Sequence, residues 1–230
     1  MDELLAALGG NDAVVSDALR PTLTQLLPGS AWEEDEHASG PMPAGAWWVV
    51  DPVGGNINTV HGMSDWNIGV SLVRDGRPVL AVLHDPLADE TFTGIAGGGA
   101  FLNGVPVRVS AKSDLGASVV GTGQAKPGQA RADAERVGAS VTAMLQHALY
   151  VRVSVPVGHQ LAQVAAGRMD LHWQFDNVRS HIGPVLLVQE AGGTVTDLDG
   201  EPWDITSEGY LAAAPGVHAA ALATLQNAFT

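Results

Sequence analysis

The residues best suited to chemistry lie around one short apolar segment. Residues 46–50 (AWWVV) form a continuous apolar run bounded by turn residues, and Asp51 follows it directly. This pattern predicts a buried strand that ends at Asp51, where a carboxylate commonly faces a site. An acidic pair, Glu33-Glu34, lies one loop earlier in the chain. Glu33 and Asp51 could hold one Mg²⁺, which prefers oxygen ligands, although a solvated acidic loop over 33–36 explains the same residues.

The turn after this strand could bind an anion. Gly54, Gly55 and Asn56 follow the expected strand. Glycine allows a ligand to approach the backbone closely, and successive N–H groups in a turn can hold a phosphate. A flexible turn without a ligand is the alternative.

Two histidines, His159 and His181, are candidates for acid–base chemistry. An unperturbed imidazole titrates near neutral pH, so either side chain could donate or accept a proton without a metal. A packed or solvated histidine is the alternative at each position.

The elements that must position these residues begin with helices and a hairpin sheet. We expect helix over residues 3–28, with a break at Gly9-Gly10 and with Pro21 in the first turn of a second helix. A Gly/Pro-rich loop follows. From residue 66 the pattern predicts an antiparallel meander with a turn at Asp75-Gly76 and strands over 66–73, 78–84 and 90–95.

The second half of the chain alternates between helical and strand patterns, which indicates layered helices and sheets. The expected helices span 130–147, 159–167 and 181–191, and the expected strands span 149–155, 194–197 and 209–213. We expect one continuous domain over 1–230, with residues 1–115 forming helices and the meander and residues 116–230 forming a smaller α/β half.

Composition limits the partners. The formal net charge of −14 opposes binding to nucleic acid or to anionic membrane, because the protein's field repels both. With no cysteine, the chain has neither a disulfide nor a thiolate nucleophile. The first residues lack the pattern of an export signal, and no apolar run approaches a membrane-spanning length, so we expect a cytoplasmic protein.

Four stretches in order resemble the inositol monophosphatase family, which also includes fructose-1,6-bisphosphatases and phosphatases of adenosine 3′,5′-bisphosphate. They cover nearly the whole chain: the acidic pair in AWEED; WVVDPVGGNIN (48–58) with its VHG tail; GAFLNG (99–104) with VRVS (107–110); and VAAGRMD (164–170) with LLVQEAGG (186–193). The resemblance implies a layered α-β-α-β-α sandwich and, since family members are mostly homodimers, a homodimer.

The resemblance also implies a ligand set, from which this chain departs. One family metal corresponds to Glu33, Asp51 and the backbone carbonyl of Val53. The second family metal needs carboxylates where this chain has Gly54 and Ser180. Asp176, four residues before Ser180, could substitute for a lost ligand.

Two further departures concern the reacting groups. The family threonine that orients the attacking water is replaced by Asn56. The family's substrate-recognition stretch maps onto residues 155–160, which include His159 and Gln160.

From these departures we expect an enzyme repurposed for metal-independent acid–base chemistry (cyclisation, isomerisation, elimination or addition) on a small polar metabolite, in a biosynthetic role. The expected cofactor is none, or a single weakly bound Mg²⁺. The cleft would contain Glu33, Asp51, Asn56, His159 and His181 as catalytic residues. Its substrate-binding residues would be Gly54, Gly55, Gln160, Ser180 and Asp176.

Two alternatives stay open. The first is a Mg²⁺-dependent phosphomonoesterase with one metal site, an inositol-phosphate-like substrate, and the phosphate resting on the amides of Gly55 and Asn56. The second is a non-catalytic pseudophosphatase that only binds a ligand or partner.

Overall fold

The meander of the first half forms one large sheet. In the computed structural model, which describes residues 2–125 and 128–229, this sheet has seven strands in chain order, β1 to β7. β1 pairs with β2 in parallel, and every later neighbour is antiparallel. The strands are β1 (Ala31–Trp32), β2 (Ala46–Gly54), β3 (Asn67–Arg74), β4 (Arg77–Asp85), β5 (Glu90–Ile95), β6 (Gly99–Leu102) and β7 (Val105–Pro106).

Local turn chemistry explains the register of this sheet. Asp75 and Gly76 both have positive φ, of 50° and 74°, as a two-residue hairpin turn of type I′ requires. The turn pairs Arg74 with Arg77 at the start of the β3–β4 ladder. The predicted turn is therefore present.

The second half of the chain forms a smaller sheet. Within the described residues its strand order is β11-β12-β10-β8-β9, with β8 parallel to both of its neighbours. The strands are β8 (Val119–Thr122), β9 (Tyr150–Val153), β10 (Leu171–Gln174), β11 (Thr194–Thr196) and β12 (Tyr210–Ala213).

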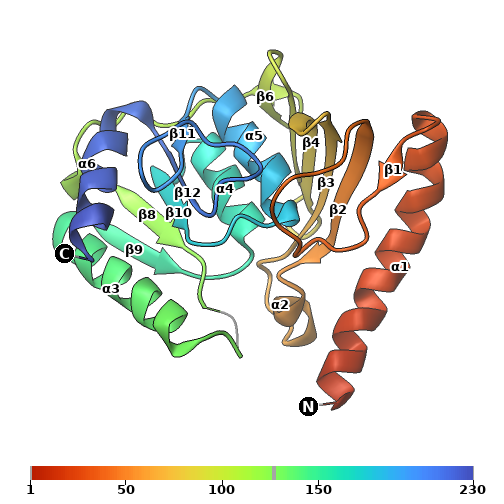
Figure 1. The fold of residues 1–230 in the computed structure, drawn as a ribbon, viewed down its shortest axis with the longest axis horizontal. Helices are drawn as coiled ribbons and strands as arrows, with labels where there is room; N and C mark the ends of the chain where they lie inside the picture. The colour runs from red at the N-terminus through yellow and green to blue at the C-terminus, as the bar shows by residue number, and fades with distance from the viewer. Residues whose placement is uncertain (1, 126–127, 230) are drawn as a thin grey trace.

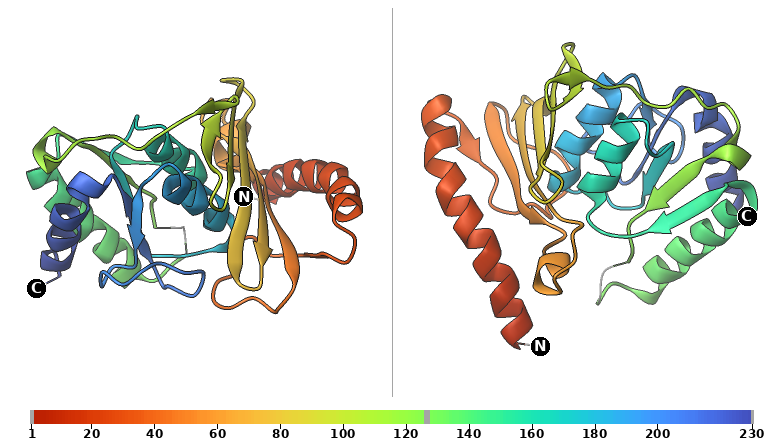
Figure 2. Two further views of the ribbon diagram at one scale, coloured as in Figure 1. Left: turned by 90° about the horizontal axis from the view of Figure 1, so that it is seen from above. Right: turned by 180° about the vertical axis from the view of Figure 1, so that it is seen from behind.

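Helices complete five layers, as Figures 1 and 2 show. α4 (Val157–Ala165) and α5 (Ile182–Glu190) lie between the two sheets, and α5 is apolar all round because it is covered on both sides. α1 (Asp2–Leu26) packs on β1 and β2, while α3 (Arg131–His147) and α6 (Pro215–Asn227) cover the outer face of the smaller sheet. The expected α-β-α-β-α sandwich is confirmed.

Several local predictions were wrong or incomplete. α1 is continuous, with Gly10 and Pro21 inside it, because its packing against β1 and β2 outweighs weak helix propensity. β2 continues past Asp51 to Gly54 through a bulge, and Pro52, which lacks an N–H, falls within it. The sequence patterns also missed the short strand β1 and the elements α2 (Asn56–Val60), β8, β10 and α6.

Candidate functional site

A cleft of about 320 Å³ opens between α1, the acidic loop and four further segments. These four are the end of β2, the short helix α2, the start of α4, and the 3₁₀ turn Arg179–His181 that precedes α5. Of the residues predicted for a site, the cleft is lined by Asp51, Val53, Gly54, Gly55, Asn56, Ser180 and His181. The fold therefore brings both halves of the chain to one place.

Close packing favours glycine at both positions after the β2 bulge, most strongly at Gly55. A Cβ on Gly54 would lie 2.6 Å from Asp51 Oδ2 and 2.7 Å from Asn67 Nδ2. Gly55 has φ of 76°, and a Cβ there would lie 2.7 Å from Pro156 Cδ and 2.9 Å from the Asp65 carbonyl. Neither position can carry a side chain unless its neighbours move.

Asn67, the first residue of β3, is a polar group that sequence reasoning missed. Its side chain is 1% exposed, and neither Oδ1 nor Nδ2 has a hydrogen-bond partner among the described protein groups. It lies behind Gly54, beside Asp51. The available signal was a single amide at the start of β3, a strand that is otherwise mostly apolar.

The Asn56 amide is held by the first helix. Asn56 Nδ2 donates to Asp12 Oδ1 at 2.8 Å, and Asn56 Oδ1 accepts from Asn11 Nδ2 at 2.9 Å. Burial raises the pKa of Asp12, and the hydrogen bond from Asn56 opposes this shift. Asn11 and Asp12 were also missed, although a polar pair directly after Gly10 was a usable signal.

The acidic loop reaches the cleft through a different residue than predicted. Glu36 lines the cleft, whereas Glu33 lines an adjoining hollow that shares Asp12 and Glu36 with it. Glu33 Oε2 accepts from Arg179 Nε at 3.3 Å. The structure thus places Glu33 beside the cleft and pairs it with a cation.

Hydrogen bonds from Arg179 connect the acidic loop to the turn before α5. Its guanidinium donates to the carbonyls of Gly40 at 2.7 Å and Pro41 at 3.2 Å, and its backbone N–H donates to Ala38 at 2.9 Å. The next N–H, of Ser180, donates to the Glu36 carbonyl at 2.9 Å. Arg179 is 4% exposed, so it is a buried cation that sequence reasoning missed.

His181 forms part of the cleft floor above a buried aromatic group. Its ring meets the Tyr210 ring edge to face, with centroids 5.8 Å apart, and Tyr210 in turn lies 6.2 Å from the His172 ring. Burial, together with the neighbouring His181, lowers the pKa of His172 to about 3. His172 is therefore neutral at physiological pH.

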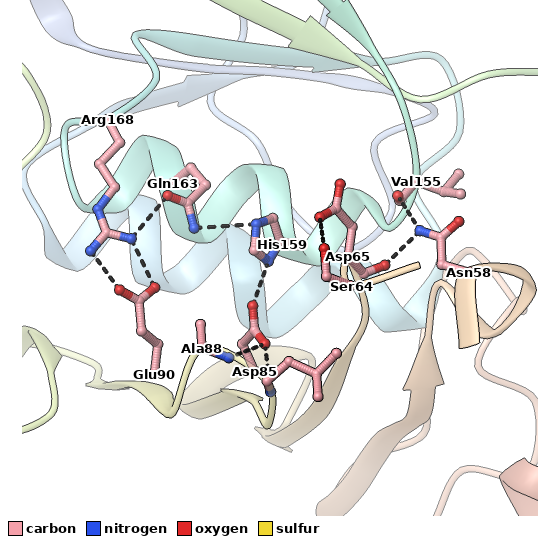
Figure 3. Close-up of polar contacts among 11 residues, drawn as sticks. Asn58, Ser64, Asp65, Asp85, Ala88, Glu90, Val155, His159, Gln163 and Arg168 are labelled. Atoms are coloured by element: carbon pink, nitrogen blue, oxygen red, sulfur yellow. Dashed lines mark hydrogen bonds and ion pairs between the residues drawn. The ribbon is translucent and has the colours of Figure 1, made fainter. Parts of the chain in front are cut away.

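Besides Glu33, three predicted site residues lie outside the cleft lining. His159 Nδ1 is 3.5 Å from Asp85 Oδ2, and His159 begins a polar row that runs through Gln163 on α4 to Arg168 beyond the end of the helix (Figure 3). Gln160 is buried, and its Nε2 donates to the carbonyls of Thr122 and Ser154. Asp176 accepts from Gln129 and lines a separate hollow.

The donor chemistry of the cleft suits a hard divalent cation. Asp12, Glu36 and Asp51 line it, and none of the described lining residues is a lysine or arginine. No cluster of three His, Asp or Glu side chains in the described part of the chain would hold a metal by itself. Mg²⁺ fits such a site because it keeps several waters and uses one or two carboxylates together with a substrate phosphate.

Comparison with known proteins identifies the family. The model of the inositol monophosphatase family matches residues 8–229. An inositol monophosphatase 1 of Solanum lycopersicum is 34% identical over 94% of this chain and 81% of its own, and an inositol-1-monophosphatase of Rhizobium meliloti is 36% identical over 79% and 68%. An inositol monophosphatase structure from Anabaena superposes with a TM-score of 0.81 at 27% identity, over 97% of this chain and 89% of that chain. The chain belongs to the inositol monophosphatase family, so the predicted resemblance is confirmed.

This membership corrects two predictions. Metal-independent acid–base chemistry was wrong as the leading function, because the relatives that match most of the chain are named as phosphatases. The expectation of no cofactor was wrong as well, because this family's hydrolysis depends on Mg²⁺. The error came from weighing Gly54 and Ser180 above the rest of the family pattern.

The described part of the chain contains no membrane-spanning helix, because none of its helices combines sufficient length with sufficient apolar character.

Proposed function

We propose that the protein is a Mg²⁺-dependent phosphomonoesterase that acts on a small phosphorylated metabolite. The charge of the cleft carries this proposal. Asp12, Glu36 and Asp51 line it, with no lysine or arginine among the described lining residues, so a phosphate would be repelled without a cation. The names of the relatives, inositol monophosphatase and inositol-1-monophosphatase, support the same reaction class.

The residues that would hold one Mg²⁺ are Asp51, the Val53 carbonyl, and a carboxylate of the acidic loop, Glu33 or Glu36. When bound, the ion would polarise a phosphoryl oxygen and make a bound water more acidic. A second ion has no carboxylate at Gly54 or Ser180 to hold it, so the proposal needs one site.

The remaining cleft residues supply binding and proton transfer. The backbone of Gly54, Gly55 and Asn56 would bind the phosphate. His181 is our candidate for the group that gives a proton to the leaving alkoxide, and Ser180 would bind substrate beside it. His159, Gln160 and Asp176 are left out because none of them lines the cleft.

Phosphate release tests this proposal. Inositol 1-phosphate, glycerol phosphate and 4-nitrophenyl phosphate are each incubated with the protein in Mg²⁺ or in EDTA. We expect release in Mg²⁺ only, and at least a 100-fold loss of kcat for Asp51→Asn. Binding of these esters without any release would favour the ligand-binding alternative.

Three further expectations remain proposals. We propose that residues 1–230 act as one domain, that the chain forms a homodimer, and that it works in the cytoplasm. Sedimentation of the full chain at micromolar concentration tests the homodimer directly.

A further inference from the structure

The cleft has an apolar side, which we call the apolar wall: Ile57, Val155, Pro156, Val157 and Val178. Four of these residues come from two segments that touch. The Asn58 side chain bridges them, since its Nδ2 donates to the Val155 carbonyl at 3.0 Å and to the Asp65 carbonyl at 2.5 Å (Figure 3). Pro156 packs against Gly55 on the same side. The part of the wall formed by Ile57 and residues 155–157 is therefore firmly held.

The wall offers few hydrogen-bond partners to a hydroxyl group. None of its side chains has a polar atom, and Pro156 has no N–H. The Val155 carbonyl already accepts from Asn58, and the Pro156 carbonyl accepts from the Gln160 N–H at 3.4 Å. The Gln160 amide, which sequence mapping placed in the substrate-recognition stretch, is turned inward to the carbonyls of Thr122 and Ser154.

A polyol would therefore lose hydrogen bonds to water along this wall without regaining them, which is unfavourable. An apolar group would gain by covering the wall. Ile57 is 36% exposed, and Val60 and Met63, which follow it in the chain, are exposed as well. The cleft volume of about 320 Å³ is at the small end for ligand sites, which suits a small alcohol.

We propose that the substrate is a phosphate monoester of a small alcohol with an apolar face, an aryl or arylmethyl alcohol, rather than of a polyol. This rests on the proposed phosphatase function and names its substrate class. In the reaction, water adds to phosphorus and the ester P–O bond breaks with its electron pair on the alcohol oxygen. That oxygen takes a proton, the water that adds loses one, and the products are inorganic phosphate and the free alcohol.

Turnover gives the first test. With Mg²⁺ present, kcat/KM for benzyl phosphate should exceed that for inositol 1-phosphate by about tenfold or more, the scale on which apolar contacts discriminate. Ile57→Thr and Val157→Thr should each reduce this ratio several-fold. Val105→Thr, in the exposed strand β7 and outside the cleft lining, is the matched control and should leave the ratio unchanged. An equal or higher kcat/KM for inositol 1-phosphate would overturn the proposal.

Binding without turnover separates this proposal from the phosphatase function. Benzylphosphonate and methylphosphonate carry the same anionic group but differ in apolar area, and neither is hydrolysed at a P–O ester bond. We expect calorimetry in Mg²⁺ to show about tenfold tighter binding of benzylphosphonate, and a smaller difference for Ile57→Thr. If no ester is hydrolysed but this difference persists, the reaction is rejected and the apolar ligand class stands. Equal affinities would overturn the ligand class even if phosphate is released.

Discussion

Arg179 Nε lies 3.3 Å from Glu33 Oε2, and this pair joins the acidic loop of the first half to the turn before α5. Arg179 is almost fully buried, whereas the Glu33 side chain is 19% exposed. The same guanidinium donates to the carbonyls of Gly40 and Pro41. The arginine therefore organises the acidic loop, in which Glu36 lines the cleft.

Replacing this arginine should destabilise the protein strongly. In Arg179→Met the carbonyls of Gly40 and Pro41 lose their donor and Glu33 loses its counter-charge, so the free energy of unfolding should fall by roughly 3 kcal/mol. Urea denaturation measures this change. Arg168→Met is the matched control, because Arg168 pairs with Glu90 at a more exposed site, and it should cost about 1 kcal/mol or less. Equal losses in the two variants would show that Arg179 has no special role.

Gly54→Asp restores a carboxylate of the family pattern, but the side chains of Asp51 and Asn67 would have to move to make room for it. Its Cβ would lie within 3 Å of Asp51 Oδ2 and Asn67 Nδ2. Crowding of this kind costs roughly 1–3 kcal/mol, so we expect the melting temperature to fall by several degrees. Gly54→Asp combined with Asn67→Ala should recover part of the loss because it removes the crowded amide. A melting temperature for the single variant that equals the parent value would contradict the geometry.

Asp51→Asn should make the melting temperature much less dependent on Mg²⁺. A ligand that binds only the folded state raises the melting temperature as its concentration rises, so the parent protein should melt higher in Mg²⁺ than in EDTA. Asp51→Asn should lose most of this rise, because it removes a negative ligand from the cleft. Asp17→Asn, at an exposed position of α1, should keep it. If Asp51→Asn keeps the whole rise, the ion binds elsewhere.

Local patterns were sufficient to predict much of the fold. Alternating residues and the Asp75-Gly76 turn predicted the hairpins, and the apolar run before Asp51 predicted the strand that delivers this carboxylate. These features depend on neighbours in the chain. α1 differs because its continuity depends on packing against β1 and β2.

The candidate site was predicted less completely because it depends on distant contacts and on helix phase. Asp12 meets Asn56 across 44 positions, and Arg179 meets Glu33 across 146 positions, which no local pattern encodes. On α4, Gly158 lines the cleft, while His159, about 100° further round the helix, turns to Asp85. A histidine at the right place in the sequence therefore sits on a different side of the helix.

His172 should make stability depend on pH. Burial and the neighbouring His181 lower its pKa from 6.5 to about 3 in the folded state, while the unfolded chain keeps an ordinary histidine. As pH falls below about 6.5, His172 binds a proton in the unfolded state but stays neutral in the folded state. The free energy of unfolding therefore falls towards pH 3, by about 1.4 kcal/mol per pH unit at most. Urea denaturation between pH 7 and 4.5 measures this slope. We expect His172→Gln to have a shallower slope whatever its stability at pH 7, and His147→Gln, at an exposed position, to keep the parent slope. An unchanged slope in His172→Gln would mean that other groups cause the acid sensitivity.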